Sequence, residues 1–319
     1  MQVLENMFSN NYAPPGGKSF KELVRWMYQR WRLRKVKKPE FLMPMVKPDI
    51  AWLKANQDKT SVTWINHATL LLQVGGKNIL TDPVFSDRVS PVTFFGPKRK
   101  APLPLSLEEL PHIDFVVISH NHYDHLDYHT VKALQLQPGG SPLFLVPLGI
   151  DLWMQKQGIN NVRAFNWWDM QIFDNIEFYF VPAQHWSART HWDRNETLWG
   201  GWVVKMPHFS FYYTGDTGYS KDFKDIAARF GGFDFAAIPV GCYEPRWFMK
   251  EQHVNPAEAV QIHIDVCSKL SLGIHWGTFA LTDEPLGQPQ EDLRKALKQA
   301  NISEEEFVLF KQGEMRVFD

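Results

Sequence analysis

The sequence Ser119-His-Asn-His-Tyr-Asp-His-Leu-Asp127 directly follows the apolar run Phe115-Val-Val-Ile118. Three imidazoles and a carboxylate at the end of a buried strand would repel or desolvate one another unless a cation lay among them. Imidazole with carboxylate and without thiolate is typical of zinc sites, with iron or manganese as alternatives. The two-residue spacing turns the first two histidines to one side, while the Asp124-His125 pair can face a second ion. The stretch therefore predicts a centre of two metal ions.

Runs rich in β-branched and aromatic residues predict strands on both sides of this motif. They cover residues 61–65, 69–73, 77–81, 115–118, 143–146, 176–181, 209–213, 235–240 and 270–274, with Gly75-Gly76 as a hairpin turn. Helices are predicted at residues 128–137, 223–229, 256–266 and 290–300. Strands interleaved with helices, without repeat or linker, indicate one layered α/β domain with its sheets inside.

Polar residues that can bind metal stand where these strands end. They are His67, Asp82, His120, His185, Asp216 and His275. Taken singly, a strand-end histidine is more often structural, and an aspartate beside a glycine is more often a cap or turn residue. Rigid strands can, however, deliver such side chains to one rim of a fold. Their order after the histidine-rich motif favours a shared site.

The formal net charge is only −1, but the charge is unevenly distributed, because a strongly basic segment lies near the N-terminus. Residues Lys18 to Lys38 include nine Lys or Arg against one acidic residue. Ser19 can cap a helix here. One apolar face of that helix would consist of Phe20, Leu23, Val24, Met27 and Trp31, beside an arginine-rich face. Such a helix can lie on an anionic membrane surface or pack on its own domain. Confinement of the positive charge to one end disfavours a nucleic-acid partner.

The two cysteines, Cys242 and Cys267, have no paired spacing, which favours a reducing compartment. No apolar stretch approaches the ~20 residues that span a bilayer, and the N-terminus lacks a secretory apolar region. We therefore expect a cytoplasmic protein that is peripheral at the inner face of a membrane, and a homodimer is compatible with these features. Residues 1–50 are predicted to form an N-terminal extension and residues 51–319 the catalytic domain.

Several further strings accompany the metal motif. They are His67-Ala-Thr69, Leu80-Thr-Asp-Pro-Val-Phe85, Gly96-Pro-Lys-Arg99, Gln184-His-Trp186, 211–219, Tyr243-Glu-Pro-Arg-Trp-Phe-Met249, Gln252-His-Val254 and His275-Trp-Gly-Thr-Phe-Ala280. In these strings the sequence resembles the metallo-β-lactamase superfamily, and most nearly N-acylphosphatidylethanolamine-hydrolysing phospholipase D and its bacterial relatives. The resemblance runs from about Trp64 to the C-terminus. It implies the metallo-β-lactamase fold, a four-layer αββα sandwich.

The resemblance also implies a role for each candidate residue. One zinc ion would be bound by His120, His122 and His185, and the other by Asp124, His125 and His275, with Asp216 bridging the two. The carboxylate of Asp82 would orient the ligand imidazoles. The substrate entrance would be lined by Tyr123, Gln252 and His253.

The implied activity is that of a zinc-dependent phosphodiesterase of the phospholipase D type, which hydrolyses N-acylphosphatidylethanolamine to N-acylethanolamine and phosphatidic acid. A metal-bridging hydroxide would attack phosphorus, with Asp124 and Asp216 as catalytic metal ligands. Either a metal-bound water or His253 would protonate the leaving alkoxide. The metal motif alone also fits a lactone or another phosphodiester, including a nucleic acid, as substrate. A scaffold with structural zinc is disfavoured, because such sites usually fill four positions with cysteine or histidine.

Overall fold

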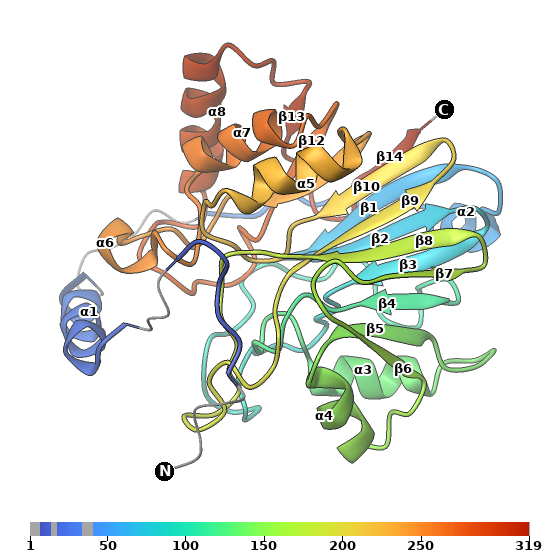
Figure 1. Ribbon diagram of the computed structural model, residues 1–319, viewed down its shortest axis with the longest axis horizontal. Coiled ribbons are helices and arrows are strands. Elements are labelled where there is room, and N and C mark those ends of the chain that lie inside the picture. Colours follow the sequence, from blue (N-terminus) through green and yellow to red (C-terminus); the bar gives the residue numbers. More distant parts are fainter. Residues whose placement is uncertain (1–6, 14–17, 34–40, 319) are drawn as a thin grey trace.

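The computed structural model describes residues 7–13, 18–33 and 41–318. Two seven-stranded sheets lie face to face, with helices on their outer faces (Figure 1). The predicted four-layer αββα sandwich is confirmed. None of the described helices is long and apolar enough to cross a membrane.

The first sheet has the strand order β14-β1-β2-β3-β4-β5-β6. Its strands are β1 (Thr60–Asn66), β2 (Thr69–Val74), β3 (Lys77–Thr81), β4 (Phe115–Val117), β5 (Leu143–Pro147), β6 (Val162–Phe165) and β14 (Met315–Phe318). Strands β1 to β3 form an antiparallel meander, and β4 to β6 continue parallel to β3. The predicted turn between β2 and β3 has positive φ at both Gly75 (59°) and Gly76 (72°), as two-residue hairpin turns of type I′ require.

The second sheet has the strand order β13-β12-β11-β10-β9-β8-β7. Its strands are β7 (Met170–Phe173), β8 (Ile176–Val181), β9 (Gly201–Met206), β10 (Phe209–Tyr213), β11 (Phe235–Pro239), β12 (Ser271–Ile274) and β13 (Phe307–Val308). Strands β7 to β10 are antiparallel neighbours, whereas β10 to β13 are parallel. Strands β6, β7, β9, β13 and β14 were not among those predicted.

The helices are α1 (Phe20–Leu33), α2 (Ile50–Ala55), α3 (Tyr128–Gln135), α4 (Ile150–Lys156), α5 (Asp222–Phe230), α6 (Arg246–Met249), α7 (Pro256–Asp265) and α8 (Gln288–Ala300). Helices α3 and α4 lie beside the first sheet, and α5, α7 and α8 beside the second (Figure 1). Helix α7 begins with a capping box, in which Asn255 accepts from the N–H of Glu258 and Glu258 accepts from the N–H of Asn255. The boundaries of the four predicted domain helices agree with the structure to within two residues.

Strand β2 illustrates why the strands read as continuous apolar runs. Leu70 and Leu72 pack in the core between the sheets, together with Phe178 of the second sheet. The side chain of Leu71 points the other way and packs with residues of α3 and α4, including Val131. Both faces of this strand are covered, so every position along it is apolar or otherwise buried.

Helix α1 carries the first part of the predicted basic segment. Ser19 and Glu22 form a capping box at its start, and the segment from residue 34 to 40 lies outside the described residues. The helix contacts the domain through Trp26, which stacks on Phe248 at 4.8 Å and donates a hydrogen bond to Asp283 at 3.0 Å. This contact leaves the predicted apolar face on the outside.

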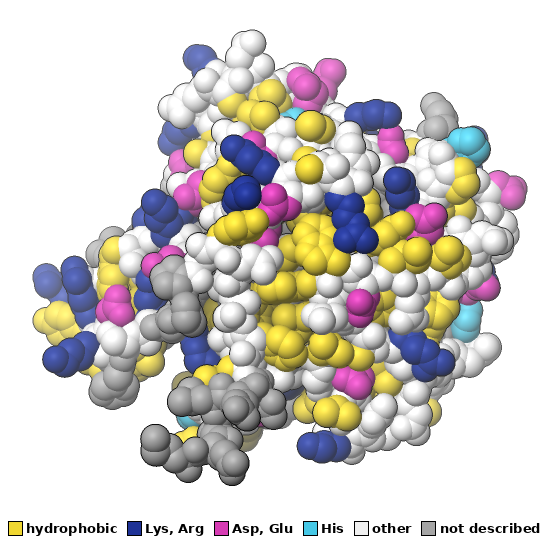
Figure 2. Space-filling view, viewed as in Figure 1, with side chains coloured by type: hydrophobic (Ala, Val, Ile, Leu, Met, Phe, Trp, Pro, Cys, Tyr) yellow, Lys and Arg dark blue, Asp and Glu magenta, His cyan; other side chains and the backbone are white. Residues whose placement is uncertain are grey.

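The predicted apolar face of α1 is open to solvent. Its members Leu23, Val24, Met27 and Trp31 are 38, 47, 59 and 54 % exposed, while the side chain of Phe20 lies outside the described residues. Helix α1 therefore packs on its own domain through Trp26 while its predicted apolar face stays exposed, and contact of that face with a membrane stays a prediction. At the left of Figure 2, the surface over α1 carries Lys and Arg side chains beside hydrophobic ones.

Segments on the N-terminal side of residue 51 also contact the folded body. The side chain of Asn10 hydrogen-bonds to the backbone of His185, and Met45 forms an isolated β-bridge with Gln312. The boundary between an extension and a catalytic domain at residue 50 stays a prediction.

Candidate metal centre

Strand direction brings the candidate residues to one end of the sandwich. Strands β1 and β3 are each antiparallel to β2 and therefore run in the same direction, which β4 shares. In the second sheet, β8, β10 and β12 likewise share one direction. The residues that follow these six strands are His67, Asp82, the loop 118–127, His185, Asp216 and His275. Their side chains converge, as the sequence of strand ends predicted.

Three imidazoles form the first group. Nε2 of His120 lies 2.8 Å from Nδ1 of His122, which in turn lies 3.3 Å from Nε2 of His185. The outer nitrogens of two of these rings have partners: Nδ1 of His120 lies 2.9 Å from the Ser119 hydroxyl, and Nδ1 of His185 donates to the carbonyl oxygen of Gln252 at 2.9 Å. Such contacts fix the tautomer and orientation of a metal ligand.

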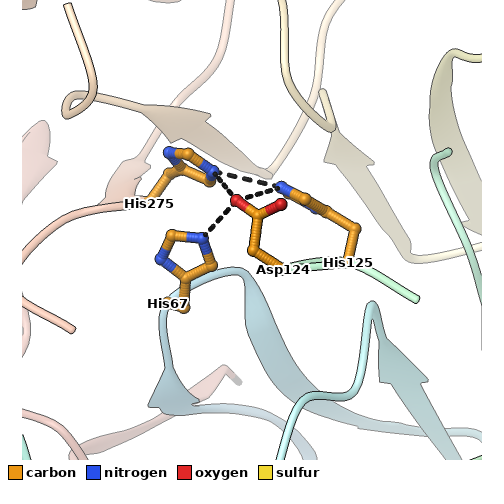
Figure 3. Close-up of side chains that lie close together, drawn as sticks. All are labelled: His67, Asp124, His125 and His275. Carbon is orange, nitrogen blue, oxygen red and sulfur yellow. Dashed lines mark hydrogen bonds and ion pairs between the residues drawn. The ribbon is translucent and has the colours of Figure 1, made fainter. Parts of the chain in front are cut away.

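A carboxylate and three imidazoles form the second group (Figure 3). Oδ2 of Asp124 lies 3.3 Å from Nε2 of His275 and 3.6 Å from Nε2 of His125. The two imidazole nitrogens are 3.1 Å apart. The fourth member is His67, whose Nε2 lies 3.2 Å from the same carboxylate oxygen. The ligand sets implied by the resemblance correspond to these two groups, and His67 is an addition to them.

Asp216 lies between the two groups. Its Oδ2 is 3.2 Å from Nε2 of His125, 3.1 Å from Nε2 of His275 and 4.0 Å from Nε2 of His185. The side chain is 3 % exposed, and its Oδ1 has no hydrogen-bond partner among the described residues. A buried carboxylate with an unpartnered oxygen is costly unless a cation or water satisfies it.

The donor set fits two metal ions of the zinc type. Four ligands at the usual 2.0–2.2 Å from one tetrahedral ion lie roughly 3.3–3.6 Å from one another, and the separations within the groups are 2.8 to 3.6 Å. Burial opposes protonation of His125, yet the carboxylates of Asp216 and Asp124 outweigh it and raise its pKa to about 10. Carboxylates that draw a proton onto a buried imidazole also favour a metal cation at the same place.

Asp82 lies behind the ligands. This buried carboxylate accepts hydrogen bonds from the N–H of Ser119 at 2.7 Å and from Nδ1 of His125 at 2.6 Å. The hydroxyl groups of Ser119 and Tyr213 donate to it as well. It therefore contacts a candidate ligand from outside the group, in the position that the resemblance implies for it.

Arg189 holds the loop that carries four of the candidate ligands. Its Nη1 donates to the carbonyl oxygens of Asn121 and Leu126, each at 2.8 Å. The guanidinium lies 4.1 Å from the ring centroid of Tyr123, whose hydroxyl donates to the carbonyl oxygen of Arg189. The loop is therefore fixed by a half-buried cation from a segment more than sixty residues away.

A cavity of about 360 Å³ opens over the centre. All three predicted entrance residues, Tyr123, Gln252 and His253, line it together with Asp124 and Asp216. Its apolar wall is formed by Trp26 of α1, Trp186, Phe248, Met249 and Leu281. An apolar wall beside charged groups suits a substrate with a lipid part and a polar reacting group.

His253 lies at the mouth of the centre. Its Nδ1 is 3.8 Å from Oδ2 of Asp216, its ring stacks over that of His275, and its side chain is 15 % exposed. Burial lowers the pKa of His253 to about 4, although Asp216 acts in the opposite direction. A neutral imidazole is therefore present at neutral pH, which suits hydrogen bonding to a substrate better than proton donation to a leaving group.

Besides Arg189 and the residues around Asp82, three further residues near the centre were not assigned a role from the sequence. His67 carried a signal, because it follows a strand as the other candidates do. Asn10 and Trp26 carried none: the first belongs to an irregular segment, and the second lies outside the apolar face predicted for its helix. Both reach the site through contacts between segments that are far apart along the chain.

Comparison with known proteins gives related sequences and structures. Residues 77–276 match the β-lactamase superfamily domain. The chain is 43 % identical over 266 residues to N-acyl-phosphatidylethanolamine-hydrolyzing phospholipase D 1 of Caenorhabditis elegans, a match covering 79 % of this chain and 74 % of that protein. It is 39 % identical over 241 residues to the mitochondrial N-acyl-phosphatidylethanolamine-hydrolyzing phospholipase D of Saccharomyces cerevisiae, covering 72 % of this chain and 50 % of that protein.

A solved structure has the same fold. The metallo-β-lactamase fold protein YhfI of Bacillus subtilis matches with a TM-score of 0.58 at 17 % identity, covering 82 % of this chain and all of that chain.

Proposed function

The chain belongs to the β-lactamase superfamily and, within it, to the family of N-acyl-phosphatidylethanolamine-hydrolysing phospholipase D, and we propose that it hydrolyses N-acylphosphatidylethanolamine to N-acylethanolamine and phosphatidic acid with two zinc ions. One observation carries the proposal: the carboxylate of Asp216 approaches imidazole nitrogens of both ligand groups, within 4.0 Å, at the base of an apolar-walled cavity. A lipid phosphodiester has the two parts that this arrangement accommodates.

The ligands are assigned to the two ions by their grouping. His120, His122 and His185 would hold one ion; Asp124, His125 and His275 the other; and Asp216 would bridge them. When bound, the ions supply an activated water as nucleophile and neutralise the charge that develops on the phosphoryl oxygens.

The remaining residues orient the ligands and the substrate. Asp82 accepts a hydrogen bond from Nδ1 of His125, which would leave Nε2 to hold a metal ion. The carbonyl oxygen of Gln252 accepts a hydrogen bond from Nδ1 of His185 in the same way. This contact links a residue of the proposed substrate entrance to the first ligand group. His253 would hydrogen-bond to the phosphoryl group from the open side, and Tyr123 would border the chain of the substrate.

Helix α1 supports a peripheral position on a membrane. Its apolar face points outward, while Trp26 on another side lines the cavity. The loops that contribute Val89 and Ala188 to the cavity wall also expose Phe94, Phe95 and Trp192, at 82, 74 and 88 %. A bilayer surface in contact with these side chains would bring phospholipid to the mouth of the cavity. The flanking basic side chains of α1 favour an anionic surface.

The test of the proposed function is a comparison of substrates. The zinc-loaded full chain is incubated with N-acylphosphatidylethanolamine, with phosphatidylethanolamine that lacks the N-acyl group, with a lactone and with a soluble phosphodiester. We expect N-acylethanolamine and phosphatidic acid as products, and in ¹⁸O-labelled water the label should enter the phosphate of phosphatidic acid, because water attacks phosphorus. Turnover of the lactone alone, or label in the N-acylethanolamine, would contradict the proposal.

A further inference from the structure

We propose that His67 is a positioning residue of the metal centre: its Nε2–H donates a hydrogen bond to Oδ2 of Asp124 and holds this carboxylate in its metal-binding orientation. The inference rests on the proposed metal centre, but on no particular substrate. His67 follows β1 and reaches the centre from the first sheet (Figure 3).

The position of His67 distinguishes it from the ligands around it. Nε2 of both His125 and His275 lies within 4.0 Å of two carboxylates, Asp124 and Asp216. Among the described residues, His67 approaches only Asp124 within that distance, at 3.2 Å. Of these two carboxylates, it therefore contacts Asp124 and not Asp216. A fourth ligand of the same ion would be expected to lie close to the bridging group as well.

The backbone fixes the imidazole of His67 in this place. Its φ of 42° lies in the left-handed region, which a residue with a β-carbon rarely adopts. Three hydrogen bonds hold the residue there: its N–H donates to the Thr278 hydroxyl at 3.0 Å, and its carbonyl oxygen accepts from the N–H of His275 at 2.9 Å and from Nε1 of Trp64 at 3.0 Å. One ligand backbone and the His67 backbone are thus joined directly.

Among the described residues, Asp124 is the only hydrogen-bond partner of the His67 ring. The residue is 1 % exposed, and its Nδ1 has no hydrogen-bond partner in the part of the chain that the structure describes. The edge-on ring of Phe279 and the ring of His275 enclose it. A buried donor in this setting is satisfied by the carboxylate, and loss of the donor would leave Asp124 free to rotate away from the ion.

The test compares His67→Ala and His67→Gln with the wild-type full chain, all loaded with zinc. The glutamine amide can donate a hydrogen bond from nearly the same place as Nε2 but is a poor zinc ligand. His263→Ala is the matched control, because His263 is also a buried histidine, hydrogen-bonded through Nδ1 to the Ser271 hydroxyl at 2.8 Å, and its contacts among the described residues include no candidate ligand.

The measurements are the number of zinc equivalents retained on dialysis against a chelator, and the rate of zinc release to an excess of it. Partners that orient ligands contribute roughly 10- to 100-fold in metal affinity, so His67→Ala should release one of its two ions at least about tenfold faster. His67→Gln should stay within about threefold of the wild type, and His263→Ala should release zinc like the wild type even where its melting temperature falls.

Three results would overturn the inference. The first is zinc release from His67→Ala at the wild-type rate. The second is equally fast zinc release from His67→Gln and His67→Ala, which would make His67 a ligand. The third is zinc release from His263→Ala as fast as from His67→Ala. A wild type that binds two ions without hydrolysing the lipid would overturn the proposed function alone, and the comparison of variants would still decide the role of His67.

Discussion

Replacing Asn10 by alanine should loosen the candidate ligand His185 without altering any side chain of the metal centre. Nδ2 of Asn10 donates to the carbonyl oxygen of His185, and Oδ1 of Asn10 accepts from its N–H, both at 3.0 Å. Nε1 of Trp199 donates to the same oxygen of Asn10 and also to the carbonyl oxygen of Ala183, each at 3.0 Å. Asn10 thus pairs with the backbone of His185 much as a neighbouring strand would.

The magnitude follows from the groups that lose a partner. A buried peptide group without a partner costs about 1–3 kcal/mol. The alanine variant leaves two such groups at His185, whereas Trp199 keeps Ala183. Since these contacts are only partly buried, we take the lower value for each and expect the free energy of unfolding to fall by about 2 kcal/mol. Because Nδ1 of His185 keeps its bond to Gln252, we expect release of one ion to be only about tenfold faster, the lower limit for such partners.

The assay measures zinc release to an excess of chelator, together with unfolding in urea. Asn11→Ala is the matched control, because Asn11 is the next residue and donates to Oδ1 of Asp222 at 2.8 Å, away from every candidate ligand. That variant should lose about 1 kcal/mol of stability and release zinc like the wild type. Equal release rates for the two variants would refute the reasoning, whatever their stabilities.

Three further predictions concern the centre and the membrane. Metal analysis of the purified protein should give near two equivalents of zinc or a related ion, and less than one equivalent without gain on reconstitution would contradict a binuclear centre. Asp216→Ala should abolish turnover with little change in circular dichroism, because the residue lies beyond a strand end; activity within about tenfold of the wild type, about 1.4 kcal/mol of barrier, would exclude the bridging role. Changing Leu23, Met27 and Trp31 together to serine should lower binding to anionic vesicles by about tenfold or more. The control Leu152→Ser changes a similarly exposed residue on α4 and should leave this binding unchanged. Equal vesicle binding by the two variants would show that α1 does not contact the membrane.

Much of the fold could be predicted because the relevant patterns are local. Strand β2 is buried on both faces and β8 is buried on one face and partly buried on the other, and both contain runs of apolar and aromatic residues that predict strands. Strand β7 was missed because it lies at the edge of its sheet and leaves Met170 and Ile172 44 and 56 % exposed. Helix α6, with four residues, is too short to show a period.

The centre could be predicted in part for a related reason. The candidate ligands can be located from the ends of strands and from one compact motif, and both features are visible in the sequence. The contact between Asn10 and His185 joins positions 175 residues apart, and that between His67 and Asp124 joins positions 57 apart. Such pairs depend on how the two sheets and the N-terminal segment pack, and no local pattern encodes that packing.

The two roles proposed for the N-terminal segment, in membrane contact and in support of the metal centre, cannot be separated by a deletion. Removing the first 38 residues would take away the exposed face of α1, the cavity wall residue Trp26 and the pairing of Asn10 with His185. Loss of activity in such a protein could follow from a weakened metal centre with no membrane effect at all. Substitutions distinguish the two, because changes at Leu23, Met27 and Trp31 leave the Asn10 contact intact, while Asn10→Ala leaves the outer face of the helix unchanged. Vesicle binding should respond to the first set and zinc release to the second, and a variant that changed both measurements would show that the helix and the metal centre are coupled.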